Sequence, residues 1–228
     1  ITVVDVNEPP IINSDGGGDT ASKDIVENTI AGTTVAATDD DDDTLSFSIS
    51  GGADAALFSL NATSGELTFI TAPDFEYPDD NDANNTYEVI VQVSDPLLID
   101  TQTITINVTD VNEPPLITSD GGGDTASKDI AENTTSVTTV TVSDDEGDSP
   151  IFSISGGVDA ALFIIDPSTG VLIFLSAPDY ENPDDHDANN VYEVIVRVSD
   201  GLLTDTQTIS VTMTDIYEFM IYIPLIMR

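Results

Sequence analysis

Tyr87-Glu-Val-Ile-Val-Gln-Val93 is rich in β-branched residues, which predicts a β-strand. Its first five residues return as Tyr192–Val196, 105 positions further along the chain. The same offset relates Ser14–Ile25 to Ser119–Ile130, where all twelve residues are identical. A constant offset means that no insertion or deletion separates the two copies, so we interpret each copy as one folding unit.

Strand patterns extend on both sides of this run. Leu45–Ser50 and Thr101–Val108 alternate apolar with polar side chains, and Asn61–Gly65 supplies a turn between two further short strands. Each copy holds roughly six or seven predicted strands, and no segment has helical periodicity. We therefore expect an all-β chain of two tandem β-sandwiches with immunoglobulin-like Greek-key connections, arranged as an elongated rod.

The boundaries of the copies are marked by a repeated linker, Asp5–Pro10 and Asp110–Pro115. Its two prolines fix the backbone and stiffen the joint. Residues 1–10 align with the last strand and linker of a repeat, so they are interpreted as the end of a preceding one. The first repeat is expected over residues 11–110, and the linker with the second repeat over 111–215. The opening strand is either the edge of a fragment cut from a longer array or a free strand that completes a neighbour's sheet.

Residues 216–228 form an apolar tail, which is interrupted by Pro224 and too short for a bilayer span of about 20 residues. It is the edge of the second unit, a sorting signal or a strand docked on another subunit.

The chain carries 43 acidic and four basic residues, for a formal net charge of −39. This charge excludes nucleic acid as a partner and disfavours anionic membrane surfaces. Closely packed carboxylates repel one another and need a counter-ion. Calcium suits them, since it takes carboxylate, amide and carbonyl oxygens. Zinc and copper lack their preferred ligands, because the chain has no cysteine and His186 is its only histidine.

An enzyme is difficult to assemble from these residues. Nucleophilic catalysis would depend on one unrepeated histidine, without any cysteine. Tryptophan is absent and aromatic residues make up 6% of the chain, so platforms for sugar binding are scarce. The sequence therefore predicts a protein that is not an enzyme.

Four kinds of acidic motif recur in the same order in both copies. They are Val26–Thr29 and Ala131–Thr134; Asp74-Phe-Glu76 and Asp179-Tyr-Glu181; Asp5–Pro9 and Asp110–Pro114; and Asp39-Asp-Asp41 with Asp95 and Asp144-Asp-Glu146 with Asp200. In this order they resemble the motifs of a cadherin repeat, in the divergent form seen in bacterial surface proteins, from about Asp5 to Asp215.

The resemblance implies that Ca²⁺ ions bind at the junctions between repeats. A complete junction would use Glu27, Asp74 and Glu76, the linker residues Asp110, Asn112 and Glu113 with the carbonyls of Val111 and Pro114, and Asp144, Glu146 and Asp200. Glu113 and Glu146 stand where the family has Asp, and Phe75 or Tyr180 replaces its Arg. One half-junction would use Asp5, Asn7, Glu8, Asp39, Asp41 and Asp95, and the other Glu132, Asp179, Glu181 and Asp215.

These features predict an extracellular or cell-surface, secreted structural protein without membrane insertion. Calcium would make its junctions rigid, and copies of the chain would associate head to tail into a filament through the terminal strand and half-sites. The alternative is a calcium-stiffened stalk or adhesin fragment of a larger bacterial surface protein that mediates cell-cell or cell-surface adhesion.

Two loops leave alternatives open. Pro78–Asn85 returns as Pro183–Asn190 and either binds a further ion through Asp80, Asp82 and Asn84 or is a solvated loop. Ser14–Thr20 lacks the features of a phosphate-binding loop and is interpreted as a glycine-rich turn.

Overall fold

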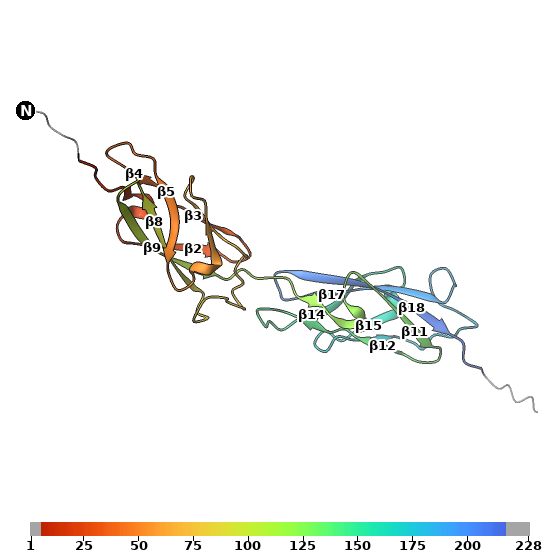
Figure 1. The fold of residues 1–228 in the computed structure, drawn as a ribbon. Helices are drawn as coiled ribbons and strands as arrows, with labels where there is room; N and C mark the ends of the chain where they lie inside the picture. The colour runs from red at the N-terminus through yellow and green to blue at the C-terminus, as the bar shows by residue number, and fades with distance from the viewer. Residues whose placement is uncertain (1–5, 218–228) are drawn as a thin grey trace, which may run out of the picture. The chain divides into compact units, whose positions relative to one another are not determined.

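A computed structural model describes residues 6–217 of the chain. The chain divides into two compact units, Ile1–Val111 and Asn112–Arg228, here called repeat 1 and repeat 2 (Figure 1). Both units are built from strands and short 3₁₀ turns, which confirms the predicted all-β class. Asp5 and the apolar segment after Tyr217 were assigned roles from the sequence and lie outside the described residues.

Repeat 1 is a sandwich of a four-stranded and a three-stranded sheet, with one additional pair of two-residue strands. The four-stranded sheet has the order β2 (Thr20–Val26), β9 (Ile99–Thr109), β8 (Thr86–Ser94), β5 (Ser46–Gly51); the three-stranded sheet has the order β3 (Ala31–Thr34), β7 (Glu66–Phe69), β6 (Phe58–Leu60); and β1 (Ile11–Ile12) pairs with β4 (Ala37–Thr38). The 3₁₀ turns are η1 (Ser14–Gly16) and η2 (Ala55–Leu57).

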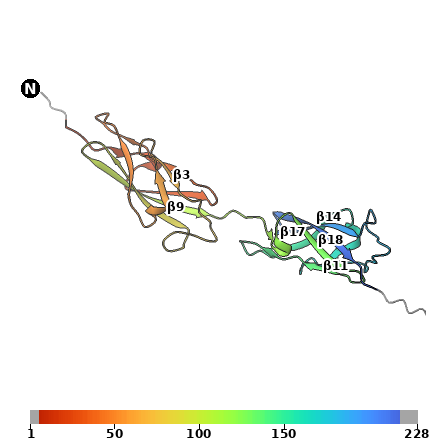
Figure 2. The same cartoon turned by 45° about the vertical axis from the view of Figure 1, so that its right-hand side comes forward.

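Repeat 2 reproduces this topology, and its strands β14, β17, β18 and β11 are labelled in both Figure 1 and Figure 2. Its four-stranded sheet has the order β11 (Thr125–Ala131), β18 (Thr204–Thr214), β17 (Val191–Ser199), β14 (Ile151–Gly156). Its three-stranded sheet has the order β12 (Ser136–Thr139), β16 (Val171–Phe174), β15 (Phe163–Ile165), and β10 (Leu116–Ile117) pairs with β13 (Val142–Ser143). The 3₁₀ turns are η3 (Ser119–Gly121) and η4 (Ala160–Leu162).

The first and last long strands of each repeat are parallel neighbours. β2 pairs with β9 in register from Thr20↔Thr103 to Val26↔Thr109, whereas the remaining pairs within the sheets of repeat 1 are antiparallel. β9 is eleven residues long and alternates buried with partly exposed side chains through most of its length. It therefore contributes to the core while joining one end of the sandwich to the other.

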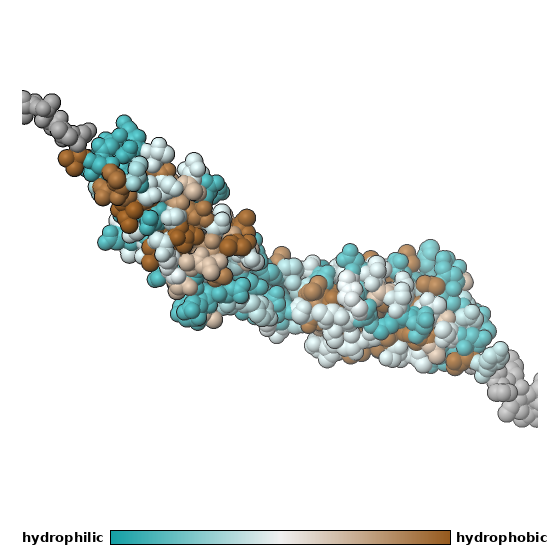
Figure 3. Space-filling view, in the orientation of Figure 1, coloured by the Kyte–Doolittle hydropathy of each residue, from teal (hydrophilic) through white to brown (hydrophobic). Residues whose placement is uncertain are grey.

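The core of repeat 1 lies between the two sheets and combines aliphatic side chains of β8 and β9 with an aromatic group. The ring of Phe69 lies 4.5 Å from that of Phe58 and 5.2 Å from that of Tyr87, the second contact being edge-to-face. Such rings bury a large apolar area with defined geometry. Repeat 2 has the same contacts around Phe174. On the visible face of each unit, hydrophobic residues form small patches among hydrophilic ones (Figure 3).

A glycine closes the predicted turn between β6 and β7. Gly65 has a φ of +69°, and a Cβ atom there would lie 2.1 Å from the carbonyl oxygen of Val35. Its own carbonyl accepts a hydrogen bond from Val35 N at 2.8 Å. Glycine is thus required both by the backbone conformation and by the close approach of the Val35 backbone, which lies between β3 and β4.

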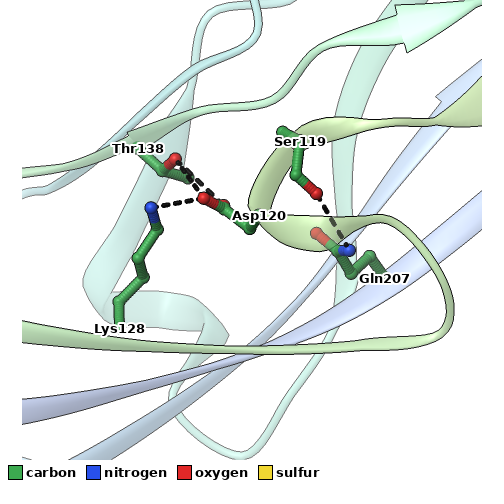
Figure 4. Close-up of polar contacts among 5 residues, drawn as sticks. All are labelled: Ser119, Asp120, Lys128, Thr138 and Gln207. Carbon is green, nitrogen blue, oxygen red and sulfur yellow. Dashed lines mark hydrogen bonds and ion pairs between the residues drawn. The ribbon is translucent and has the colours of Figure 1, made fainter.

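Two groups of polar contacts hold the glycine-rich turn, and Figure 4 shows them in repeat 2: Asp120 contacts Lys128 and Thr138, and Gln207 Nε2 donates to the carbonyl of Ser119 at 3.4 Å. Asp120 forms an ion pair with Lys128 and accepts a hydrogen bond from Thr138 Oγ1 at 3.0 Å. Gln207, which is fully buried, donates through Nε2 to the carbonyl of Gly123 at 3.0 Å. Lys23 pairs with Asp15 in the same way in repeat 1. The two lysines of this acidic chain therefore serve to fix the turn.

Candidate metal centres at the ends of each repeat

Two sets of oxygen-bearing side chains lie at opposite ends of each repeat. In repeat 1, Asp95 precedes β9 and Val111 follows it; the eleven residues of this strand span about 36 Å. The N-terminal set comprises Asn7, Glu8, Asp39, Asp41 and Asp95 in repeat 1 and Asn112, Glu113, Asp144, Glu146 and Asp200 in repeat 2. The C-terminal set comprises Glu27, Asp74, Glu76 and Asp110 in repeat 1 and Glu132, Asp179, Glu181 and Asp215 in repeat 2.

The centre of the C-terminal set is a buried glutamate placed immediately after β2. Glu27 is 2% exposed, and its two oxygens accept hydrogen bonds from Phe75 N at 2.7 Å and Val111 N at 2.8 Å. In repeat 2, Tyr180 N and Ile216 N donate to Glu132 in the same manner, both at 2.9 Å. The donation from Ile216 and then that from Tyr180 lower the pKa of Glu132. This glutamate thus stays charged and ties the Asp-Phe/Tyr-Glu segment to the linker.

Other carboxylates gather around this glutamate. Ligand oxygens of Glu27, Asp74 and Glu76 lie within 4.8 Å of one another, as do those of Glu132, Glu181 and Asp215 in repeat 2. Desolvation, followed by the charges of Glu132, Asp215 and Asp179, raises the pKa of Glu181.

Asp110 is exposed, and one of its carboxylate oxygens lies within 4.8 Å of one of Glu76. Asp179 is placed differently, since its Oδ1 accepts from Glu181 N and Asn182 N at 3.0 and 3.1 Å.

The N-terminal set is organised by the aspartate that opens the turn between β8 and β9. Asp95 is 8% exposed; its Oδ1 accepts the amides of Leu97 and Leu98, and its Oδ2 accepts Asn7 Nδ2 at 2.9 Å. The amide of Leu98 contributes most to the lowered pKa of Asp95. The linker asparagine is therefore bound directly to the repeat that follows it in sequence.

Asp200 has the equivalent environment in repeat 2, where Asn112 Nδ2 donates to its Oδ2 at 2.8 Å. That hydrogen bond is the largest cause of its lowered pKa.

A glutamate can replace an aspartate in this set. Asp41 Oδ2 accepts the amide of Glu8 at 2.9 Å in repeat 1, and Glu146 Oε1 accepts the amide of Glu113 at 2.7 Å in repeat 2. The longer side chain of Glu146 reaches the same backbone donor. The substitution noted in the sequence therefore preserves the local contact.

One oxygen of the N-terminal set is buried without a hydrogen-bond partner in both repeats. Asp39 Oδ1 accepts the amides of Asp41 and Asp43 at 2.9 and 3.3 Å, whereas its Oδ2 is buried and accepts none. Asp144 Oδ2, at the equivalent position, is likewise buried without a partner. A buried carboxylate oxygen left unsatisfied is costly. A cation placed there would satisfy this oxygen in both repeats.

The sequence prediction missed Asp43, which the structure brings into this set. Ligand oxygens of Asp39, Asp41 and Asp43 lie within 4.8 Å of one another. Desolvation by burial, followed by the charges of Asp39, Asp95 and Asp41, raises the pKa of Asp43. Continuing the spacing of Asp39 and Asp41 by two residues would have included Asp43.

The donors of both sets fit calcium. They are carboxylate, side-chain amide and backbone oxygens, which this hard cation prefers, and His186 belongs to neither set. The acidic loop before β8 has a different arrangement. Asp80 accepts the amides of Asn84 and Asn85 at 2.9 and 3.1 Å, and buried Asp54 accepts those of Asn81 and Glu88 at 2.8 and 2.7 Å. These two carboxylates close the loop onto the strand.

The chain is similar in sequence and in fold to proteins of the protocadherin group. No family model matches the chain. It is 27% identical to human protocadherin Fat 1 over 230 residues, covering 96% of this chain and 5% of that protein. It is 28% identical to human protocadherin Fat 4 over 142 residues, covering 60% of this chain and 3% of that protein. The structure matches the crystal structure of human protocadherin-24 EC1-2 (form II) with a TM-score of 0.54 and 21% identity, over 92% of this chain and all of that one.

The fold is cadherin-like. This confirms the predicted class of two tandem β-sandwiches and the cadherin-like character of the repeats. The chain spans about a twentieth of the length of protocadherin Fat 1. Within residues 6–217 no helix is long and apolar enough to cross a membrane.

Proposed function

We propose that the cadherin-like chain is an extracellular calcium-binding structural protein whose inter-repeat junction becomes rigid when calcium binds. We further propose that copies associate head to tail into a filament through their terminal half-sites. The protocadherin relatives support the extracellular setting. The alternative is a calcium-stiffened stalk or adhesin fragment of a larger bacterial surface protein, which mediates adhesion.

One observation carries the proposal: consecutive residues of the linker are bound to different sets. The amide of Val111 donates to Glu27, in the C-terminal set of repeat 1. The side chain of Asn112 donates to Asp200, in the N-terminal set of repeat 2. Their Cα atoms are about 3.8 Å apart, as in any trans peptide. Because these two residues are adjacent in the chain, each set is bound to the same short linker, and this supports a shared metal centre of the two sets.

The residues have distinct roles in such a centre. The carboxylate of Glu27 accepts two hydrogen bonds and that of Asp200 accepts three, and one of the donors to each belongs to the linker, so these two residues position the linker. Asp74, Glu76, Asp110, Asp144 and Glu146 supply carboxylate oxygens, with Val111, Asn112 and Glu113 contributing from the linker.

Bound calcium would neutralise these charges and crosslink the segments; at tenfold excess over its dissociation constant it adds about 1.4 kcal/mol per site. Without a cation, the carboxylates repel one another and the linker is held by hydrogen bonds to Glu27, Asp200 and Glu146.

Small-angle X-ray scattering with and without chelator tests the rigid junction. In millimolar calcium we expect the full chain to have one well-defined maximum dimension. In chelator we expect a broader distribution of interatomic distances. In calcium, the scattering profile of Asp110→Asn should resemble that of the wild type in chelator. Its circular dichroism spectrum should stay unchanged, which shows that the repeats remain folded. Glu66→Gln, an exposed charge outside both sets, is the matched control. Equal profiles for the wild type in both conditions would refute the calcium junction.

Assembly is tested by electron microscopy and sedimentation velocity over a wide concentration range. Long filaments that dissolve in chelator support head-to-tail association. Uniform short rods that remain monomeric in millimolar calcium refute it and leave the stalk.

A further inference from the structure

The outer face of the three-stranded sheet of repeat 2 is lined by apolar side chains. Buried and outward side chains alternate along β15 and β16, and the outward ones are Ile164, Val171, Ile173 and, just after β16, Leu175. Ile164 and Ile173 are paired across the two strands. The side chains of Ile164, Val171 and Leu175 are 49%, 39% and 60% exposed. These four residues are here called the apolar face.

The equivalent face of repeat 1 is mostly polar. Three positions differ in this way, since Ser59, Glu66 and Thr68 of repeat 1 correspond to Ile164, Val171 and Ile173 of repeat 2. The strand pairing is nevertheless the same, because Ser59 pairs with Thr68. The fold therefore does not require apolar side chains at these positions, and a contiguous exposed apolar patch is typical of a surface that contacts another segment.

The segments that follow the two repeats differ in the same sense. After β9 the chain continues into the acidic linker Asp110–Glu113, whereas the sequence after β18 leads to Phe219–Met227, a run without any charged residue. This run is here called the terminal run. The repeat that carries the apolar face is thus also the one that is followed by an apolar segment.

The chain leaves repeat 2 within reach of the apolar face. The amide of Ile216 donates to one oxygen of Glu132, and the amide of Tyr180 donates to the other, both at 2.9 Å. Leu175 lies five residues before Tyr180, which places it at most about 17 Å away. The strand β16 covers about a further 13 Å, and residues 217–227 span up to about 36 Å when extended. The terminal run is therefore long enough to cross the apolar face.

A hollow beside Leu175 lies between this exit and the rest of the apolar face. It has a volume of about 230 Å³, whereas the equivalent hollow of repeat 1 has about 100 Å³. Its lining includes Leu162, Leu175 and Pro178. The carbonyl of Pro178 accepts a hydrogen bond from Asn133 N at 2.9 Å, next to Glu132 in the chain. The hollow thus continues the apolar face toward the point where the chain leaves the repeat.

We propose that the terminal run packs over the apolar face of its own repeat 2, with one of its side chains in the hollow beside Leu175. Burial of apolar surface on both partners drives this packing. The inference does not rest on calcium, because the apolar face contains none of the candidate ligands. The terminal run would then be unavailable for docking on another copy, which leaves any head-to-tail association to the half-sites.

The test is an NMR comparison, in chelator, of the full chain with a chain that ends at Tyr217 and keeps every described strand. The amide signals of the apolar face should shift between the two chains. The equivalent positions in repeat 1 (Ser59, Thr68 and Ile70) are the matched controls, and their signals should not move. Unmoved signals of the apolar face, or equal shifts in both repeats, would overturn the proposal.

A double variant, Ile164→Ser with Ile173→Thr, tests the face itself. It introduces the pair that repeat 1 carries at these positions, so the sheet should still fold, and circular dichroism checks this. Removing the terminal run from the double variant should shift the amide of Leu175 several-fold less than the same removal does in the wild type. Shifts as large as those in the wild type would overturn the proposal.

A spin label on Met227→Cys distinguishes packing within one chain from packing between copies, and the chain has no native cysteine to compete for the label. In a labelled chain, the amide signals of Ile164 and Ile173 should broaden. A mixture of labelled chain with unlabelled, ¹⁵N-enriched chain should show no such broadening. Broadening only in the mixture would mean that another copy covers the face, and this would overturn packing on the run's own repeat.

Discussion

Val111 donates its backbone amide to Glu27 Oε1 at 2.8 Å, so the last residue of repeat 1 is bound to a glutamate at the end of β2. Glu27→Gln would remove the charge and direct an amide group toward one of two backbone donors. We expect a loss of about 1–3 kcal/mol in the free energy of unfolding, because charge-assisted hydrogen bonds are lost and a buried donor is left unpaired. Urea denaturation in chelator measures it. Glu66→Gln is the control, and equal midpoints for the two variants would contradict the role of Glu27.

Stability in chelator should have a maximum in mild acid. Asp95, Glu132 and Asp200 have folded pKa values below their ordinary ones, so their contribution is present above the ordinary value and lost as pH falls through the folded value. Asp43 and Glu181 have folded pKa values above their ordinary 3.8 and 4.5. As pH falls, these two groups take up protons in the folded state before they do so in the unfolded state, so they raise the free energy of unfolding.

We expect the urea midpoint in chelator to rise from neutral pH to about pH 5 and to fall below about pH 4. Saturating calcium should abolish the rise, because the cation already offsets the repulsion. Profiles that rise equally with and without calcium would contradict this explanation.

Gly65→Ala should destabilise repeat 1 by more than about 2 kcal/mol, because the residue has a positive φ and its Cβ would collide with the Val35 carbonyl. Gly16→Ala separates the two effects: Gly16 also has a positive φ, +91°, but a Cβ atom there meets nothing within 4 Å. It should cost about 1 kcal/mol. Thermal unfolding by calorimetry gives both losses of stability. A loss below about 2 kcal/mol for Gly65→Ala would show that the Val35 backbone can shift to accept the added Cβ atom.

The ion pair in the glycine-rich turn can be tested by a double-mutant cycle. The side chain of Asp120 is 7% exposed, so Lys128→Met leaves a nearly buried carboxylate without its cation. We expect a loss of about 1–3 kcal/mol in unfolding free energy. Adding Asp120→Asn should recover part of the loss. Additive effects in urea denaturation would mean that the pair does not interact.

Most of the fold follows from local patterns in the sequence. The alternation in Thr101–Val108 predicts β9, and the run at Tyr87–Val93 predicts β8; the structure extends these strands to Ile99–Thr109 and Thr86–Ser94. Parallel pairing of β2 with β9 could not be predicted, since periodicity does not specify partners. The two-residue strands β1 and β4 are too short to give any period.

The candidate sites were predictable to the extent that motif order defines them. The buried position of Glu27 and the role of Asn112 as a donor required coordinates, because both depend on contacts 84 and 88 residues apart in sequence. Asp43 was missed because its neighbours are also aspartates, and composition alone does not distinguish the inward from the outward members of the run. By sequence, the acidic loop at Asp80 fitted either an ion site or a solvated loop; in the structure Asp80 accepts the backbone amides of Asn84 and Asn85, contacts that the sequence pattern did not predict.

The parallel pairing of β2 with β9 has a mechanical consequence. The chain enters the sheet at the start of β2 and leaves at the end of β9, and the two strands run side by side in the same direction over seven residues. Tension applied to the linkers at both ends would slide one strand along the other. The hydrogen bonds between them then bear the load together instead of opening one after another. Each repeat is thus arranged to resist stretching along the direction in which the linkers transmit it.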